Sequence, residues 1–167
     1  MFISPQTAID NNWISGIADP DTQLQPNAID FTLDTVYTID KESTFFLTNS
    51  DKKMRGGSKL LPDENNNWTL PPNTVHDGMS AMYVDIPEGV AALLIIRSTL
   101  NRNGIFLTSG LYDSGFQGHI AYALHNRSGV TMIEKGTRVG QIIFVESASV
   151  GMYVGGYNHK LGTHHTN

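Results

Sequence analysis

The chain has 167 residues, of which 40% are hydrophobic and only 16% are charged, so we expect one domain with a full hydrophobic core. Its 16 glycines and low charge favour a turn-rich β protein over a helical one. The lack of cysteine excludes disulfide bonds, thiolate catalysis and cysteine-held zinc, and the net charge of −5 disfavours binding to a nucleic-acid backbone.

The first residues and the lengths of the apolar runs indicate the cellular location of the protein. Residues 1–5, Met-Phe-Ile-Ser-Pro, do not begin a basic segment followed by a long apolar run, so no signal peptide is predicted. No apolar stretch approaches the roughly 20 residues that cross a membrane. We therefore expect a cytoplasmic protein with no membrane partner.

One short helix is predicted near the start of the chain. Ser4 is a suitable N-cap and is followed by proline, which favours the first helical position. Ile9 and Trp13 lie four residues apart on one helical face, and Gly16 is a plausible residue for ending the helix. This pattern predicts a helix over residues 5–14, followed by a turn at residues 19–21.

The rest of the chain is typical of a β protein. Alternating apolar residues predict a strand over 29–39 and a short one over 45–48. Residues 49–67 are polar and are interpreted as a surface loop or insertion, whose basic residues are solvated. Short strands separated by Gly, Pro and Asn turns then predict an all-β sandwich or barrel, over residues 68–70, 80–86, 90–96, 105–107, 119–126, 131–133 and 141–146.

Three features between residues 95 and 126 carry the candidate chemistry. Arg97 and Ser98 form a turn at a strand end, where a guanidinium and a hydroxyl can bind a phosphate. Asp113 lies on a glycine-bounded hairpin and can hold a water molecule. Phe116, three residues later, can cover the face of a sugar or base. Together they predict a nucleotide site that cleaves phosphate esters with water.

Four segments in the same order resemble the motifs of the superfamily of trimeric dUTPases and dCTP deaminases. They are residues 25–30, 97–100, 110–118 continuing to Asn126, and 135–141. A fifth motif, a glycine-rich arm with an aromatic residue, is matched only weakly by residues 155–157. The resemblance implies a distorted jelly-roll or β-clip barrel with one short N-terminal helix, spanning residues 1–150, and a C-terminal arm over residues 151–167.

The resemblance also implies roles for individual residues. Asp113 would polarise a water for attack on the α-phosphorus of dUTP, with Mg²⁺ bridging phosphate oxygens. Asp30 would hold waters of that metal ion, and Phe116 would pack under the deoxyribose. Arg97, Ser98 and Gln141 would bind the phosphates, and the loop of Thr108, Ser109 and Gly110 would read the base. Tyr157 of the arm would stack on the base, and Thr99 and Arg102 would complete the substrate-binding residues. The arm lacks the family's usual phosphate-binding arginine, for which Lys160 is a candidate substitute.

The two branches of the superfamily differ in one testable respect. Deaminating cytosine needs a general acid or base at the ring, and the position of the deaminase glutamate is Ala123 in this sequence. The neighbouring deaminase histidine position is Gly110, whereas Arg102 keeps the deaminase spacing. We therefore expect dUTP hydrolysis. A deaminase or hydrolase acting on dCTP or a modified pyrimidine, a regulatory nucleotide-binding protein and a structural β-sandwich remain alternatives.

Each candidate residue also has a purely structural interpretation. Asp113 could be a turn acid, Arg97 a partner in a surface ion pair, and Asp30 the cap of a neighbouring turn. Phe116 could belong to the core, and Gln141 could be an ordinary edge residue. The six histidines recur in no pattern with carboxylates that indicates a metal site.

The resemblance implies a homotrimer with sites between subunits. One chain would supply the second and fourth motifs, and the next chain would supply the hairpin around Asp113. The C-terminal arm could cross to a neighbouring subunit.

Overall fold

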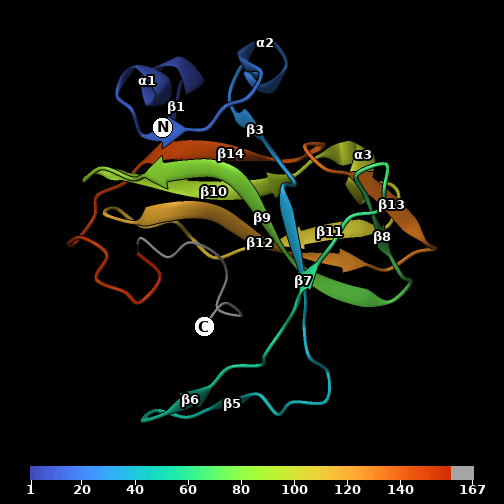
Figure 1. The fold of residues 1–167 in the computed structure, drawn as a ribbon. Helices are drawn as coiled ribbons and strands as arrows, with labels where there is room; N and C mark the ends of the chain where they lie inside the picture. Colours follow the sequence, from blue (N-terminus) through green and yellow to red (C-terminus); the bar gives the residue numbers. More distant parts are fainter. Residues whose placement is uncertain (159–167) are drawn as a thin grey trace.

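Two antiparallel sheets form the body of the protein in a computed structural model, which describes residues 1–158 (Figure 1). In the first sheet, β14 (Arg138–Glu146) pairs with β10 (Val90–Ile96), β1 (Phe2–Ile3) and β3 (Ile29–Thr32). The second sheet runs in the order β11 (Ile105–Thr108), β12 (Gln117–Asn126), β9 (Thr74–Asp85), β4 (Thr35–Thr38) and β7 (Lys59–Leu60), and β2 (Ile14–Ser15) also pairs with β9. The predicted all-β architecture is confirmed.

Two small ribbons complete the strands. β8 (Asn67–Leu70) pairs with β13 (Thr131–Glu134) beside the second sheet. β5 (Phe46–Leu47) and β6 (Lys52–Lys53) form a hairpin that projects away from the body (Figure 1). The polar stretch 49–67 is therefore not a plain loop, because it contains β6 and β7 and the first residue of β8.

The core lies between the sheets and follows from the alternation of side chains along the strands. In β12 every second residue is buried, from Gly118 to Asn126, while the residues between them face outward and are half-buried. Gly140 of β14 lets a core aromatic approach closely, because a Cβ there would lie 2.2 Å from the Phe31 ring. The Phe31 ring in turn packs against Tyr122, with ring centroids 5.0 Å apart.

The N-terminal helix is shorter than predicted. α1 spans Pro5–Asp10, and the Oγ of its N-cap, Ser4, accepts a hydrogen bond from the Thr7 amide at 3.1 Å. The prediction that it reaches residue 14 is wrong, because Asn12 adopts a left-handed conformation (φ 59°) that ends the helical path. The chain then joins the second sheet as β2, and Gly16 follows that strand rather than the helix.

The predicted strand over residues 29–39 is two strands in different sheets. β3 pairs with β14, whereas β4 pairs with β9. Between them Leu33 is buried, and Asp34 accepts hydrogen bonds from the Ala81 amide (2.8 Å) and the Thr32 hydroxyl (2.6 Å). These contacts fix the crossing from one sheet to the other.

Two further helices are single turns, α2 (Pro20–Gln23) and α3 (Ser98–Asn101). They lie where turns were predicted. β10 has the predicted bounds, whereas β9, β12 and β14 begin earlier than predicted. No helix in the described part of the chain is long and apolar enough to cross a membrane.

The C-terminal segment over residues 151–158 contains no strand or helix but contacts the body. The Tyr153 amide donates to the Ser114 carbonyl at 2.6 Å, and Oδ1 of Asn158 accepts from the Gln117 amide at 3.1 Å. The candidate Lys160 and the terminal histidines lie outside the described residues.

Candidate functional site

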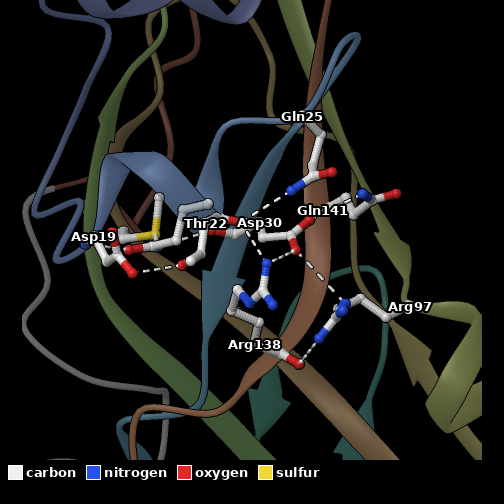
Figure 2. Close-up of polar contacts among 9 residues, drawn as sticks. Asp19, Thr22, Gln25, Asp30, Arg97, Arg138 and Gln141 are labelled. Carbon is white, nitrogen blue, oxygen red and sulfur yellow. Dashed lines mark hydrogen bonds and ion pairs between the residues drawn. The ribbon is translucent and has the colours of Figure 1, made fainter.

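A buried carboxylate with basic partners lies on the first sheet, where β3, β14 and the end of β10 meet (Figure 2). Asp30 of β3 is only 1% exposed. Its Oδ2 lies 3.2 Å from Nη1 of Arg138 and 3.5 Å from Nε of Arg97, and its Oδ1 accepts from Nε2 of Gln141 at 2.9 Å. Arg97 also donates to the Arg138 carbonyl at 3.1 Å.

The sheet register explains why these side chains meet. Asp30 pairs directly with Gln141 across β3 and β14, and Ile95, two residues before Arg97, pairs with Gln141 on the other side. Directly paired residues in an antiparallel sheet point to the same face. The candidates Asp30, Arg97 and Gln141, taken from three separate motifs, are thus brought together.

The cluster has one acid and two bases, so it carries a net positive charge on a protein whose overall charge is −5. The side chains of Arg97 and Arg138 remain about 30% exposed, whereas Asp30 lies beneath them. A guanidinium has five N–H donors, and the contacts to Asp30 and to backbone carbonyls use only some of them. The pair is therefore held in place by Asp30 while it still presents donors to solvent, an arrangement suited to phosphate oxygens.

Three more candidates lie on α3, next to this cluster. The Arg97 amide donates to the Val139 carbonyl at 3.1 Å, which ties the start of α3 to β14. Ser98 and Thr99 form the first turn of α3, and Arg102 follows its last residue; all three side chains are exposed.

A separate cavity of about 370 Å³ lies on the outward face of the second sheet. Five predicted residues line it, namely Thr108, Ser109, Gly110, Phe116 and Tyr157. The remaining lining residues are Ile39, Asp77, Leu111, Tyr112, His119, Ala121, Tyr122, Ala123 and Tyr153. The cavity is large enough for a pyrimidine, and most of its wall is aromatic or aliphatic.

Aromatic packing shapes this cavity. Phe116 makes edge-on contacts with Tyr112 and Tyr153, with ring centroids 4.9 and 5.8 Å apart. A cation lies over the ring of Tyr157, because Nζ of Lys52 is 5.7 Å from its centroid. The β5–β6 hairpin, interpreted from sequence as a solvated loop, therefore reaches a residue of the cavity wall.

Burial controls the ionisation of two tyrosines in the cavity wall. It raises the pKa of Tyr112 and raises the pKa of Tyr122 well above its ordinary value. Their hydroxyls donate to the carbonyls of Ala121 at 3.0 Å and Thr32 at 3.2 Å. Both side chains are therefore neutral at physiological pH and do not serve there as bases.

Asp113 lies on a tight hairpin and lines a second cavity. Its carbonyl accepts from the Phe116 amide at 3.0 Å, and Gly115 adopts φ +88°, which favours glycine at this point of the turn. Its exposed side chain lines a cavity of about 420 Å³ together with Ala91, Ser114 and residues 147–153. Tyr153 lines both this cavity and the 370 Å³ cavity, so the two are neighbours.

Asp113 and Arg97 lie at opposite ends of β10. Ala92, near the start of that strand, forms an isolated bridge with Tyr112, the residue before Asp113. Arg97 follows the end of the strand, five residues after Ala92, which corresponds to roughly 17 Å at ~3.3 Å per residue. Arg97 and Gln141 line neither of the two cavities. Within one chain, the arginine cluster and Asp113 therefore lie too far apart to share one cavity.

Sequence reasoning missed two charged residues. Arg138 lies within the fourth motif, so its guanidinium could have been included with Arg97. Asp77 lies near the start of β9, where no spacing or motif distinguishes it, and its place in the 370 Å³ cavity follows only from strand pairing.

The described residues do not form a metal site of protein ligands. They contain no group of three or more His, Cys, Asp or Glu side chains that could hold a metal ion. Both Asp30 oxygens contact side-chain nitrogens of the cluster. Neither oxygen is therefore left for direct ligation of a metal ion, and a role of Asp30 in holding the waters of Mg²⁺ stays a prediction.

Known proteins resemble this chain over most of its length. A family model described as dCTP deaminase-like matches residues 6–147. A probable deoxyuridine 5'-triphosphate nucleotidohydrolase from Methanosarcina barkeri is 32% identical over 143 residues, covering 81% of this chain and 82% of that protein. A dCTP deaminase, dUMP-forming, from Bifidobacterium animalis subsp. lactis is 30% identical over 151 residues, covering 87% and 77%.

A solved structure shows the same fold. The 2'-deoxycytidine 5'-triphosphate deaminase from Agrobacterium tumefaciens superposes with a TM-score of 0.67 at 16% identity. The match covers 87% of this chain and 48% of that one, so this chain spans about half the length of the solved chain. The predicted jelly-roll type of fold is confirmed.

Proposed function

This chain belongs to the dCTP deaminase-like family, and from that membership and the geometry above we propose that it hydrolyses dUTP to dUMP and pyrophosphate. Two relatives support the choice of reaction: the probable deoxyuridine 5'-triphosphate nucleotidohydrolase from Methanosarcina barkeri, at 32% identity, and the deoxyuridine 5'-triphosphate nucleotidohydrolase from Methanocaldococcus jannaschii, at 30% identity. The observation that carries the proposal is the guanidinium pair of Arg97 and Arg138, locked over the buried Asp30.

The arginine pair supplies positive charge and hydrogen-bond donors, which phosphoryl transfer needs to stabilise its transition state. Negative charge spreads over the phosphate oxygens in the transition state, and donors already fixed in place stabilise it without reorganising. Arg97, the Ser98 hydroxyl and Gln141 bind the triphosphate, and Thr99 and Arg102 on α3 extend the same surface. Asp30 acts as a positioning residue, since its carboxylate contacts both guanidiniums and the Gln141 amide.

The chemical step is an in-line displacement at the α-phosphorus. Asp113 accepts a hydrogen bond from a water and takes up its proton as the water oxygen forms a bond to phosphorus. The bond from the α-phosphorus to the bridging oxygen breaks, and pyrophosphate leaves. A magnesium ion bound to the triphosphate would neutralise part of the charge, and Asp30 would be the residue that holds its waters.

The 370 Å³ cavity holds the nucleoside. Phe116 covers the deoxyribose, the backbone of Thr108, Ser109 and Gly110 reads the base, and Tyr157 stacks from the C-terminal segment. On β12, Ala123 places a methyl group in the wall of this cavity. A methyl group cannot shuttle a proton to the ring, which supports hydrolysis over deamination.

A homotrimer would complete the site. Because β10 separates Arg97 from Asp113 within one chain, a single nucleotide needs the arginine cluster of one subunit and the hairpin of the next. Exposed apolar side chains on the outer face of β10, Leu93 at 39% and Ile95 at 48%, support burial of this face against another subunit.

The proposed function is tested with purified protein, Mg²⁺ and each of the four deoxynucleoside triphosphates plus dUTP. Pyrophosphate and ammonia are both measured, and Asp113→Asn serves as the inactive variant. Pyrophosphate release from dUTP that is lost in Asp113→Asn is expected. Ammonia release from dCTP would instead identify a deaminase, and hydrolysis retained by the variant would remove Asp113 from its role.

A further inference from the structure

The C-terminal segment over residues 151–158 docks on the tight hairpin that precedes β12. Besides the hydrogen bond from the Tyr153 amide to the Ser114 carbonyl, Nδ2 of Asn158 donates to the Gly115 carbonyl at 3.4 Å. The fit is close, because a Cβ at Gly115 would lie 3.0 Å from the Tyr153 nitrogen. The segment therefore occupies a place that this hairpin leaves open for it.

The docked segment completes the wall of the 370 Å³ cavity without being paired in a sheet. Tyr157 lines that cavity, but the residue is 43% exposed. A segment without strand or helix pairing opens at a small cost in free energy unless other contacts hold it. A contact on the ring of Tyr157 therefore affects how much of the time the cavity wall is complete.

Such a contact comes from an element far away in the sequence. The β5–β6 hairpin extends beyond β4 and β7 of the second sheet (Figure 1), and Nζ of Lys52 on β6 lies 5.7 Å from the centroid of the Tyr157 ring. An ammonium group within about 6 Å of an aromatic ring is attracted to the face of the ring. A two-stranded ribbon is only marginally stable in water, so the contact also helps to hold the hairpin in place.

The hairpin brings positive charge to a protein that is otherwise acidic. Residues 41–59 contain five Lys or Arg and two Asp or Glu, a net charge of +3, so the rest of the chain carries −8 of the total of −5. A nucleoside triphosphate is strongly anionic, and a basic element beside the cavity attracts it. The charge of the hairpin and its contact with Tyr157 thus both favour a nucleotide in this cavity.

We infer that Lys52 is a positioning residue that holds the Tyr157 ring against the 370 Å³ cavity and so couples the β5–β6 hairpin to nucleotide binding. Lys52 acts through the ring and needs no contact with the base or with the reacting phosphorus. The inference rests on the proposed function only in taking this cavity as the site of the nucleoside.

The test compares Lys52→Met with Lys52→Arg and Lys53→Met. Methionine removes the charge and keeps a long flexible side chain, whereas arginine keeps a charge that also interacts with aromatic rings. Lys53→Met is the matched control, because it removes the same charge from β6 but successive side chains of a strand point to opposite faces. Both lysines are exposed, so all three variants are expected to fold.

Two amides report the docking of the C-terminal segment independently of activity. The Tyr153 amide donates to the Ser114 carbonyl and the Gln117 amide to Oδ1 of Asn158, so their hydrogen exchange follows the opening of the segment. In NMR measurements, Lys52→Met is expected to lower the protection of both amides by about two- to fivefold, as for the loss of one exposed cation–π contact. Lys52→Arg and Lys53→Met should keep the wild-type protection.

The same loss is expected in substrate binding. In Lys52→Met, KM for dUTP rises by about two- to fivefold, while kcat stays unchanged because the contact does not involve the reacting phosphorus. The other two variants keep the wild-type KM. The affinity for a non-hydrolysable dUTP analogue, measured by calorimetry, should follow KM.

Unchanged protection in Lys52→Met, or an equal loss in Lys53→Met or Lys52→Arg, would overturn the inference and leave the proposed function standing. Reduced protection in Lys52→Met with unchanged KM and analogue affinity would also overturn it, because the ring would then not serve nucleotide binding. If wild type releases no pyrophosphate from dUTP, the analogue decides: weaker binding by Lys52→Met alone supports the inference although the proposed function is wrong, and equal binding overturns both.

Discussion

At the scale of single side chains, Asp30 is a buried carboxylate whose negative charge is compensated by neighbouring donors. A carboxylate that is 1% exposed is costly unless donors surround it, and here two guanidiniums and an amide do so. The arginines themselves remain partly exposed, so they can be solvated if the acid is removed. The acid therefore matters more for the position of Arg97 and Arg138 than for neutralising them.

We expect Asp30→Asn to fold but to bind triphosphate poorly. The amide keeps the shape of the side chain but loses the charge-assisted contacts, at a cost of about 1–3 kcal/mol in the free energy of unfolding. Urea denaturation measures this loss, and KM for dUTP is expected to rise more than kcat falls. An unchanged KM would show that Asp30 does not position the arginines.

A buried histidine next to Asp77 makes stability depend on pH. Burial, with a smaller contribution from the positive charge of Lys41, lowers the pKa of His76 from its ordinary value of 6.5. The unfolded chain therefore binds a proton at a higher pH than the native protein does. The contribution of His76 to stability is full above about pH 6.5 and is lost as the pH falls toward its native pKa.

Wild-type protein is accordingly expected to lose unfolding free energy between pH 7 and pH 5, and His76→Gln to lose less over the same interval. Urea denaturation at several pH values gives both slopes. Equal slopes would show that other groups govern the acid sensitivity.

At the scale of elements, the sequence predicts strands well where local signals bound them. β10 could be predicted to the residue, because its apolar run lies between Gly89 and Arg97. The helix end could not be predicted, because the spacing of Ile9 and Trp13 continues past a left-handed Asn12. The division between β3 and β4 is likewise hidden, since apolar alternation continues while the chain changes sheets.

A glycine on β14 sets how closely the core can pack. A Cβ at Gly140 would lie 2.2 Å from the buried Phe31 ring, which is itself held against Tyr122. We expect Gly140→Ala to cost about 1–3 kcal/mol in unfolding free energy through overpacking. Thermal unfolding should show a melting temperature lower by several degrees.

The control for this change is Gly129→Ala, since a Cβ at Gly129 would have no neighbour within 4 Å. That variant is expected to melt close to wild type. Equal melting temperatures for the two variants would show that Phe31 can move aside.

At the scale of the whole molecule, the motifs predict which residues lie close together but not which of them lie far apart in one chain. Thr108, Ser109, Gly110, Phe116 and Tyr157 were predicted together and line one cavity. Asp77 could not be predicted with them, because only the pairing of β9 with β12 places it there. The span of β10 between Arg97 and Asp113 likewise becomes evident only in three dimensions.

A mixing experiment tests the proposed division of the site between subunits. Asp113→Asn and Arg97→Ala are each expected to be inactive alone. Refolded together in equal amounts, they should regain about a quarter of the wild-type rate, because random assembly joins an intact hairpin to an intact arginine cluster at that frequency. An inactive mixture would indicate that both groups act within one chain.

The span of β10 also has a consequence for kinetics. If no chain holds a whole reaction centre, turnover per chain depends on protein concentration rather than being constant. Diluting the enzyme into substrate should give progress curves that bend downward as subunits separate, whereas circular dichroism of each separated chain stays that of a β protein. Nucleotide hydrolysis would then report assembly directly, with no need for a label.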